Sequence, residues 1–368
     1  MKKIFIVTGE LSGDITAGWY LNKIKEKEEI VAYAVGGQNL QQAGAIIYDD
    51  FNKLNIAGVV EILGRLKFIF SYLKKITNYI LENNFDELIL VDFPGFNLML
   101  AKAIKKKNKK IKITYVSPPQ VWIWGEYRIK KLKKYCDNLI VMYPFEVDWY
   151  KTRGLNAQFL GNPLCENLKA FIYSDLEVKN QIAILPGSRK QEIVKLMPVL
   201  SWVIKKILAK YPDIRIIFPV AKSLDVNFVT TELNKYNLEN YMQNIVFVLD
   251  EEEKKRELKQ SILAITKPGT VSLELALLGV PSIIIYKTSW LTYWIAKLVV
   301  NIKCMGLPNL FSKKIVFKEF IQGDCKENLI VNEVDKLYNS FINKQDYYFE
   351  IKKDLEKIKK NLCQHECC

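Results

Sequence analysis

Histidine is almost absent from this chain, and the one that occurs, His365, lies three residues from the end. Ser-His-Asp and Cys-His nucleophile mechanisms and multi-histidine metal sites therefore lose their central residue. The seven cysteines form no Cys-x-x-Cys pair. Cys363, Cys367 and Cys368 stand beside the histidine in the final segment NLCQHECC. A metal clip is one interpretation of that segment. We expect instead a frayed terminus with incidental cysteines.

Long apolar runs are also missing. No stretch reaches the ~18 uncharged apolar residues that a membrane-spanning helix needs. The opening MKKIFIVTGE has a short apolar core interrupted by glycine and glutamate. This core is too brief for a signal peptide and is typical of a first β-strand. We therefore expect a cytoplasmic protein. With 49% hydrophobic and 26% charged residues the composition is that of a folded, globular chain.

Acidic residues are outnumbered, because 54 Lys and Arg against 40 Asp and Glu leave a net charge of +14. Such an excess suggests an anionic partner, which could be nucleic acid, an anionic membrane or a phosphorylated substrate. A lysine-rich genomic bias explains the excess equally well, so both interpretations stay open. The basic run KAIKKKNKKIK is typical of a solvated helix end. No RNA-recognition, zinc-finger or helix-turn-helix signature accompanies it, and we expect no nucleic-acid partner.

Short apolar runs alternate with helical patterns along the whole chain. KIFIVTG, VAYAVGG, ELILVDFPG, KITYVSP and NLIVMYP each read as a strand that ends at Gly or Pro. The pattern restarts near residue 165 with IAILPGS, IRIIFPVA, NIVFVL, SILAITKPG and VPSIIIYK. Strands too apolar to have a wet face predict parallel sheets covered on both sides. We predict an α/β fold with two doubly wound domains, 1–165 and 166–330, facing a central cleft, and a helical tail at 331–368.

Two strand-to-helix turns in the second half are suited to anions. After IAIL, Ser188 and Arg189 open a helix, and after ILAIT a second helix begins at Gly269 and Thr270. Unpaired N–H groups at a helix start favour phosphate, and arginine adds a bidentate fork. Glu274, one turn into an apolar helix, can accept two ribose hydroxyls. These residues predict a nucleotide site; the alternatives are an ordinary serine cap and a Glu274 pair with a lysine such as Lys267.

Acidic and aromatic residues follow the strands of the first half. The loop GELSGD places Glu10 and Asp14 after the first strand, and Asp92 ends another strand as a candidate general base, although turn capping is commoner. Two acids in the first loop suit a sugar or an amine better than a pyrophosphate. SPPQVWIWGEYR brings Trp122 and Trp124 close to Arg128, as a sugar platform or as core residues.

The segment 56–81 mixes aromatic and basic residues. Phe68 and Phe70 alternate with Arg65 and Lys67, followed by further lysines. Such a helix can lie in the interface of an anionic bilayer, while periodicity alone favours a packed helix with snorkelling lysines.

Seven motifs in order resemble the lipid-A-disaccharide synthase family. They are GELSGD, DFPGFN, YVSPPQVWIW, LPGSRKQE, KPGTVSLELALLGVPSIIIYK, LTYWIAK and LPNL, and FIQGDCKENL resembles a further family segment. The resemblance spans Val7 to about Leu329. Many members carry a second aspartate where this chain has Gly95, histidine where it has Asn162, and serine where it has Pro268. The first departure bears on the general base, for which Asp92 remains, with Glu10 and Asp14 as alternatives.

The resemblance implies a GT-B glycosyltransferase that needs no metal and works at the cytoplasmic face of the inner membrane of Gram-negative bacteria. It implies inverting transfer from UDP-2,3-diacylglucosamine to 2,3-diacylglucosamine 1-phosphate, with release of UDP. Arg189 then corresponds to a diphosphate ligand, Glu274 to a ribose ligand, and Asn309 and Gln322 to further donor positions. A lipid product favours the membrane interpretation of 56–81. A homodimer is left open. The alternative is another UDP-sugar GT-B enzyme, such as a 2-epimerase or a transferase with another acceptor.

Overall fold

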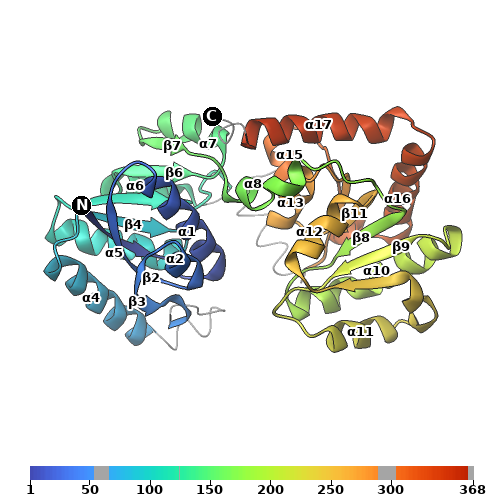
Figure 1. Cartoon of the computed structure of the whole chain (residues 1–368), viewed down its shortest axis with the longest axis horizontal. Helices are drawn as coiled ribbons and strands as arrows, with labels where there is room; N and C mark the ends of the chain where they lie inside the picture. Colours follow the sequence, from blue (N-terminus) through green and yellow to red (C-terminus); the bar gives the residue numbers. More distant parts are fainter. Residues whose placement is uncertain (54–65, 124, 289–303, 364–368) are drawn as a thin grey trace. The chain divides into compact units, whose positions relative to one another are not determined.

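The computed structural model describes residues 1–53, 66–123, 125–288 and 304–363. The chain divides into two compact units, Met1–Pro163 and Leu164–Cys368 (Figure 1). The division falls next to the predicted boundary at residue 165. Each unit is built on a parallel sheet with helices on both faces, so the predicted α/β class with two doubly wound sheets is confirmed.

The first unit is a seven-stranded sheet in the order β3-β2-β1-β4-β5-β6-β7. Its strands are β1 (Lys2–Val7), β2 (Ile30–Gly36), β3 (Ile46–Asp50), β4 (Glu87–Val91), β5 (Lys112–Val116), β6 (Asn138–Val141) and β7 (Ala157–Phe159). Its α-helices are α1 (Leu11–Lys25), α2 (Gln38–Gln42), α4 (Leu66–Glu82), α5 (Pro94–Lys107), α6 (Ile129–Tyr135) and α7 (Pro144–Lys151). Short 3₁₀ turns, η1 and η2, cover Phe51–Lys53 and Glu126–Arg128.

The strands of this unit are apolar on both faces because both faces are covered. Phe5 and Val7 of β1 belong to a core that Ile76 of α4 and Ile104 of α5 share. Successive strand residues point to opposite faces, so the equally buried Ile6 lies on the other side, where α1 packs. This explains why the strands read as continuous hydrophobic runs rather than alternating ones.

The second unit is a six-stranded parallel sheet in the order β10-β9-β8-β11-β12-β13. Its strands are β8 (Gln181–Leu185), β9 (Arg215–Pro219), β10 (Ile245–Val248), β11 (Leu263–Thr266), β12 (Ser282–Tyr286) and β13 (Lys318–Ile321). Its α-helices are α8 (Pro163–Asn167), α9 (Lys169–Ile172), α10 (Lys190–Lys210), α11 (Val226–Asn234), α12 (Glu251–Lys259), α13 (Thr270–Leu277), α15 (Leu307–Ser312), α16 (Glu327–Ile342) and α17 (Asp346–Cys363). The 3₁₀ turns η3 and η4 cover Glu239–Asn244 and Gln322–Asp324.

Helices α10, α11 and α16 bury one face of the second sheet, while α12 and α13 lie on the other. In α10, Ile193, Met197, Leu200 and Ile204 recur at the spacing of one helix face and are all buried. The predicted tail belongs to this unit, because α17 packs on α13, α15 and α16. Its buried side chains include Leu355.

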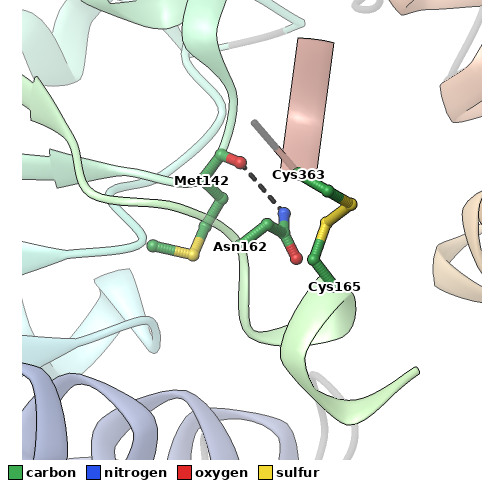
Figure 2. Close-up of a disulfide and its surroundings, with 4 residues drawn as sticks. All are labelled: Met142, Asn162, Cys165 and Cys363. Atoms are coloured by element: carbon green, nitrogen blue, oxygen red, sulfur yellow. Dashed lines mark hydrogen bonds between the residues drawn. A yellow bond between two sulfur atoms is a disulfide. The ribbon is translucent and has the colours of Figure 1, made fainter. Parts of the chain in front are cut away.

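A disulfide joins Cys363, the last residue of α17, to Cys165 in α8 (Figure 2). The two Cα atoms lie 5.6 Å apart, and both side chains are buried. The expectation of a frayed end with incidental cysteines is therefore wrong for Cys363, because α17 carries it against α8. His365, Cys367 and Cys368 lie outside the described residues.

Candidate functional site

In the second unit the strand order reverses between β8 and β11, which are neighbours in the sheet. Connections from these two strands leave toward opposite sides, so a crevice opens beyond their carboxyl ends. A cavity of about 280 Å³ lies there. Its lining comes from the turns after β8, β9 and β11 and from α12 and α13: Leu185, Gly187, Ser188, Pro219, Val220, Ala221, Glu251, Lys254, Lys267, Thr270, Val271 and Glu274.

The turn after β8 brings a carboxylate to the start of α10. Gly187 has a φ of 133°, and a Cβ there would lie 2.2 Å from Glu192 Oε2. Glu192 accepts the backbone N–H of Ser188 at 3.1 Å and pairs with Lys267 at 2.7 Å. Only glycine combines this backbone angle with the close approach. The predicted anion turn therefore holds an anionic group of the protein itself, between a backbone donor and a lysine.

The turn after β11 leaves its helix start open. Gly269, with a φ of 128°, precedes Thr270, the first residue of α13, and a Cβ at Gly269 would meet nothing within 4 Å. Ser272 Oγ donates to the Gly269 carbonyl oxygen at 2.7 Å, which steadies the turn. The first N–H groups of α13 thus lie beside the cavity that Thr270 lines.

Glu274 has a cationic partner that sequence reasoning did not find. The Lys254 ammonium lies 3.4 Å from Glu274 Oε1, whereas Lys267 pairs with Glu192 instead. Burial raises the pKa of the Glu274 carboxyl, and Lys254 opposes this. Burial alone would lower the pKa of Lys254, but Glu274 and Glu251 together hold it above its ordinary value. The carboxylate is thus compensated within the protein while it still lines the cavity.

The other predicted donor residues, Arg189, Asn309 and Gln322, do not line this cavity. Arg189 follows Ser188 directly but is exposed and does not line the cavity. Asn309 is fully buried, donates to the Phe317 carbonyl at 2.7 Å and accepts two backbone N–H groups. Gln322 exchanges two hydrogen bonds with the backbone of Thr288. Both amides therefore join segments around β13. The motif LTYWIAK lies outside the described residues.

The first sheet has its own switch point, between β1 and β4. Asp92 follows β4 there with a φ of 49°, and Phe93 follows with a φ of 47°. Left-handed backbone at two consecutive non-glycine residues is strained and persists only when its surroundings hold it. The hydroxyl of Tyr115 and the amide of Asn97 both donate to the Asp92 carbonyl oxygen, at 2.6 Å and 2.8 Å. These contacts hold the backbone of Asp92 in this conformation beyond the strand end.

Asp92 has the electrostatics of a general base. Burial raises the pKa of its carboxyl to about 6, and the negative charge of Glu10 acts in the same direction. The Phe93 N–H, which donates to Oδ1 at 3.0 Å, opposes the shift. Glu10 itself is exposed, just before α1. The structure therefore brings Glu10 close enough to Asp92 to act on its charge at the β1–β4 switch point.

Asp14, the other alternative base, has a structural role in the turn before α2. Its carboxylate accepts the backbone N–H groups of Gly37 and Asn39, at 2.7 Å and 2.9 Å, and the Asn39 amide at 2.9 Å. It is fully buried and holds the start of α2 against α1.

Two positions where the chain departs from many family members were noted in the first unit. Gly95 is exposed, and a Cβ there would meet nothing within 4 Å. Asn162 donates to the Met142 carbonyl at 2.9 Å (Figure 2).

Trp122 is half-buried, and its indole N–H donates to Glu146 at 2.8 Å. Burial raises the pKa of Glu146 to about 7, against the stabilising donors Trp122, Tyr143 and Met142. Arg128 stacks over the ring of Tyr127, 5.6 Å from its centroid. Trp124 lies outside the described residues.

Helix α4 presents an exposed basic and aromatic face. Phe68 and Phe70 are 41% and 57% exposed, and Lys67 and Lys74 are exposed beside them. The opposite face, with Ile76, is buried in the core. Arg65 lies outside the described residues.

In the part of the chain that the structure describes, no helix is long and apolar enough to cross a membrane. Within the same residues, no cluster of acidic, cysteine or histidine side chains could hold a metal ion.

Two doubly wound parallel sheets, each with a switch point, are the architecture of the GT-B fold. The fold matches MurG of Acinetobacter baumannii, with a TM-score of 0.56, 13% identity and coverage of 99% of this chain and 96% of that one. It also matches the UDP-GlcNAc 2-epimerase of Neisseria meningitidis bound to UDP-GlcNAc, with a TM-score of 0.62, 12% identity and coverage of 98% and 97%.

Comparison of the sequence with known proteins identifies the family. The model of the family described as lipid-A-disaccharide synthetase matches residues 4–367. The lipid-A-disaccharide synthase of Coxiella burnetii (strain RSA 331 / Henzerling II) is 32% identical over 349 residues, covering 92% of this chain and 89% of the relative. The chain therefore belongs to the lipid-A-disaccharide synthase family of glycosyltransferases, which act in lipid A biosynthesis.

Proposed function

We propose that the enzyme transfers 2,3-diacylglucosamine from its UDP derivative to 2,3-diacylglucosamine 1-phosphate, with inversion at the donor's anomeric carbon. The acceptor's 6-hydroxyl oxygen forms the new bond to that carbon, its proton passes to a protein base, and the bond to the UDP oxygen breaks. The products are the disaccharide 1-phosphate and UDP. Membership of the family supports the substrate class.

The cavity at the β8–β11 switch point is the observation that carries the donor half of this proposal. It combines the open start of α13, the Lys267 ammonium and the buried Glu274 carboxylate within about 280 Å³. Backbone N–H groups and a lysine suit a diphosphate, and a carboxylate suits the two hydroxyls of a ribose. In this proposal UDP binds in the cavity, and Ser188 and Thr270 contact its phosphates. Arg189, beside the turn after β8, also binds the phosphates.

Asp92 is our candidate for the general base. A carboxyl whose pKa is about 6 is mostly ionised at neutral pH and still accepts a proton from a hydroxyl that is losing it to bond formation. Departing UDP carries negative charge, which the α13 start stabilises together with the Lys267 ammonium, which Glu192 also contacts. Glu10 raises the basicity of Asp92 and is the alternative base.

Helix α4 is our candidate for membrane attachment at the cytoplasmic face of the inner membrane. Exposed phenylalanines enter the interface between head groups and acyl chains, and each lysine near an anionic surface contributes ~1 kcal/mol. Both features occur on the face that carries Phe68, Phe70 and Lys67. A substrate with acyl chains is taken from such a surface.

The test is UDP release on mixing the purified protein with UDP-diacylglucosamine and diacylglucosamine 1-phosphate in detergent. Acceptor-dependent release together with a disaccharide product is the expected result. Release without acceptor, or conversion of UDP-GlcNAc to its 2-epimer, would instead favour the 2-epimerase activity of proteins with a similar fold. Absence of UDP binding would contradict the donor site itself.

A further inference from the structure

Lys254, which forms an ion pair with Glu274, has no role in the reaction as proposed above. Lys254 comes from α12 and Glu274 from α13, so the pair joins two helices on one face of the sheet. The Lys254 ammonium lies 3.4 Å from Glu274 Oε1 and 3.4 Å from Glu251 Oε2, and the side chain is only 22% exposed. All three residues line the cavity beyond β8 and β11.

We propose that Lys254 is a positioning residue that keeps the Glu274 carboxylate ionised and directed into the cavity, ready to accept both hydroxyls of a ribose. The inference rests on the proposed function, because it assumes that a nucleotide occupies this cavity. Lys254 acts through Glu274 and need not contact the nucleotide itself.

The charges around Glu274 make Lys254 the relevant cation. On α12, Lys255 faces Glu274 at longer range, but its ammonium bonds Glu252 at 2.5 Å and Asn167 at 2.9 Å. Lys267, in the turn before α13, is paired with Glu192 at 2.7 Å. Among the residues that the structure describes, Lys254 is the one that forms an ion pair with Glu274. Glu251 acts in the opposite direction, since its negative charge raises the pKa of Glu274.

The protonation state of Glu274 decides what it can bind. An ionised carboxylate accepts two hydrogen bonds from neighbouring hydroxyls, whereas the neutral acid has a proton on one oxygen and loses one acceptor position. Charge-assisted hydrogen bonds are also about twice as strong as neutral ones. Burial already raises the pKa of Glu274, and loss of the Lys254 charge would raise it further, so the neutral fraction would be larger at any given pH.

The test compares Lys254→Met with Lys254→Arg by calorimetric titration with UDP between about pH 5.5 and about pH 8.5. The terminal phosphate of UDP itself ionises near about pH 6 in every titration, so each affinity is expressed relative to that of the wild type at the same pH. A profile is called flat or pH-independent when this ratio does not change with pH. Lys254→Met should lose about tenfold in affinity at neutral pH, a difference of about 1.4 kcal/mol. Its affinity should recover as rising pH ionises Glu274. Lys254→Arg keeps the charge and should restore both the affinity and the flat profile.

Arg256→Met is the matched control, since it removes a cation from the same helix, where Arg256 pairs with exposed Glu253 outside the cavity. It should bind UDP as the wild type does. Thermal unfolding of each variant shows whether it is folded. If Lys254→Met does not fold, Lys254→Gln replaces it in the same titration.

Glu274→Gln distinguishes a failure of the proposed donor site from a failure of the positioning role of Lys254. A weakened, pH-independent affinity that falls no further in the Lys254→Met/Glu274→Gln double variant supports the positioning role. If Glu274→Gln binds UDP normally, the proposed donor site is wrong and this inference falls with it. If Glu274→Gln is weak but Lys254→Met binds normally, the positioning role alone is overturned. A weak Lys254→Met with a flat pH profile also overturns it, because Lys254 then acts without Glu274.

Discussion

At the scale of single residues, the first prediction concerns Asp92, the proposed general base. Its folded pKa, about 6, lies above the ordinary value of 3.8, so the ionised form that a base needs is lost as pH falls through about 6. We expect kcat/KM to be constant above that pH and to fall below it. Asp92→Asn should lower kcat by about 10²–10⁴-fold, the usual contribution of general base catalysis, with UDP affinity unchanged.

Stability provides the control for this substitution. A carboxyl whose folded pKa is raised destabilises the folded state at pH values above it, where the buried group is charged. Asp92→Asn should therefore not lower the thermal unfolding temperature at about pH 8. An Asp92→Asn enzyme with normal kcat would exclude Asp92 as the base and direct attention to Glu10.

Glu10 offers a second test at the same scale. Its negative charge contributes to the raised pKa of Asp92. Glu10→Gln should remove that contribution, lower the pKa of Asp92 and move the acid limb of the kcat/KM profile to lower pH. The profiles of the two enzymes, measured side by side, check this. An acid limb that stays in place would mean that another group controls it.

The sequence predicted the residues that follow strands but not the contacts between helices. Glu10, Asp92, Ser188 and Thr270 all follow strands, and the carboxyl ends of parallel strands meet at one edge of a sheet. The contacts of Asp14 with Asn39, 25 residues away, and of Lys254 with Glu274 depend on how helices pack. No local pattern encodes those contacts, since EEEKKRELK reads as an ordinary charged helix.

At the scale of single elements, α4 separates a core face from an exposed face. Its periodicity predicted both faces, but only the structure shows that Phe68 and Phe70 are left out of the core. Phe68→Ser/Phe70→Ser should weaken binding to anionic phospholipid vesicles by about 10–100-fold, because each buried aromatic is worth ~1.5–3 kcal/mol and these would be partly inserted. UDP affinity should be unchanged.

Vesicle co-sedimentation measures this effect. The matched control is Ile342→Ser, which removes an apolar side chain that is 53% exposed at the end of α16. The hypothesis fails if the double variant binds vesicles as tightly as the control does.

The disulfide between α8 and α17 is the second feature at this scale. It links residues 198 positions apart, and closing so long a loop restricts the unfolded chain. Cys363→Ser should therefore lower the free energy of unfolding by about 2–5 kcal/mol. Denaturant unfolding with and without reductant measures this: reductant should destabilise the wild type and leave Cys363→Ser unchanged. Cys304→Ser, which removes a free thiol, is the control. Equal stability of the wild type with and without reductant would show that the bond does not form in solution.

At the scale of the whole molecule, each unit has its own sheet, its own core and its own switch point. The alternation of strands and helices predicted two such sheets, because a sheet covered on both faces imposes the same apolar pattern wherever it occurs. Strand order was not visible in that pattern. Only the structure shows that the turns after β8 and β11 are neighbours.

This division leads to a prediction about the isolated second unit. Every residue that lines the donor cavity lies between Leu185 and Glu274, inside Leu164–Cys368. A fragment of residues 164–368 should therefore fold, bind UDP within about tenfold of the full chain, a difference of about 1.4 kcal/mol, and transfer no sugar, because Asp92 is missing. Cooperative thermal unfolding establishes that the fragment is folded, and calorimetry measures binding, with Glu274→Gln in the fragment as the control. A folded fragment without UDP affinity would mean that the first unit supplies nucleotide contacts, since nothing else has been removed.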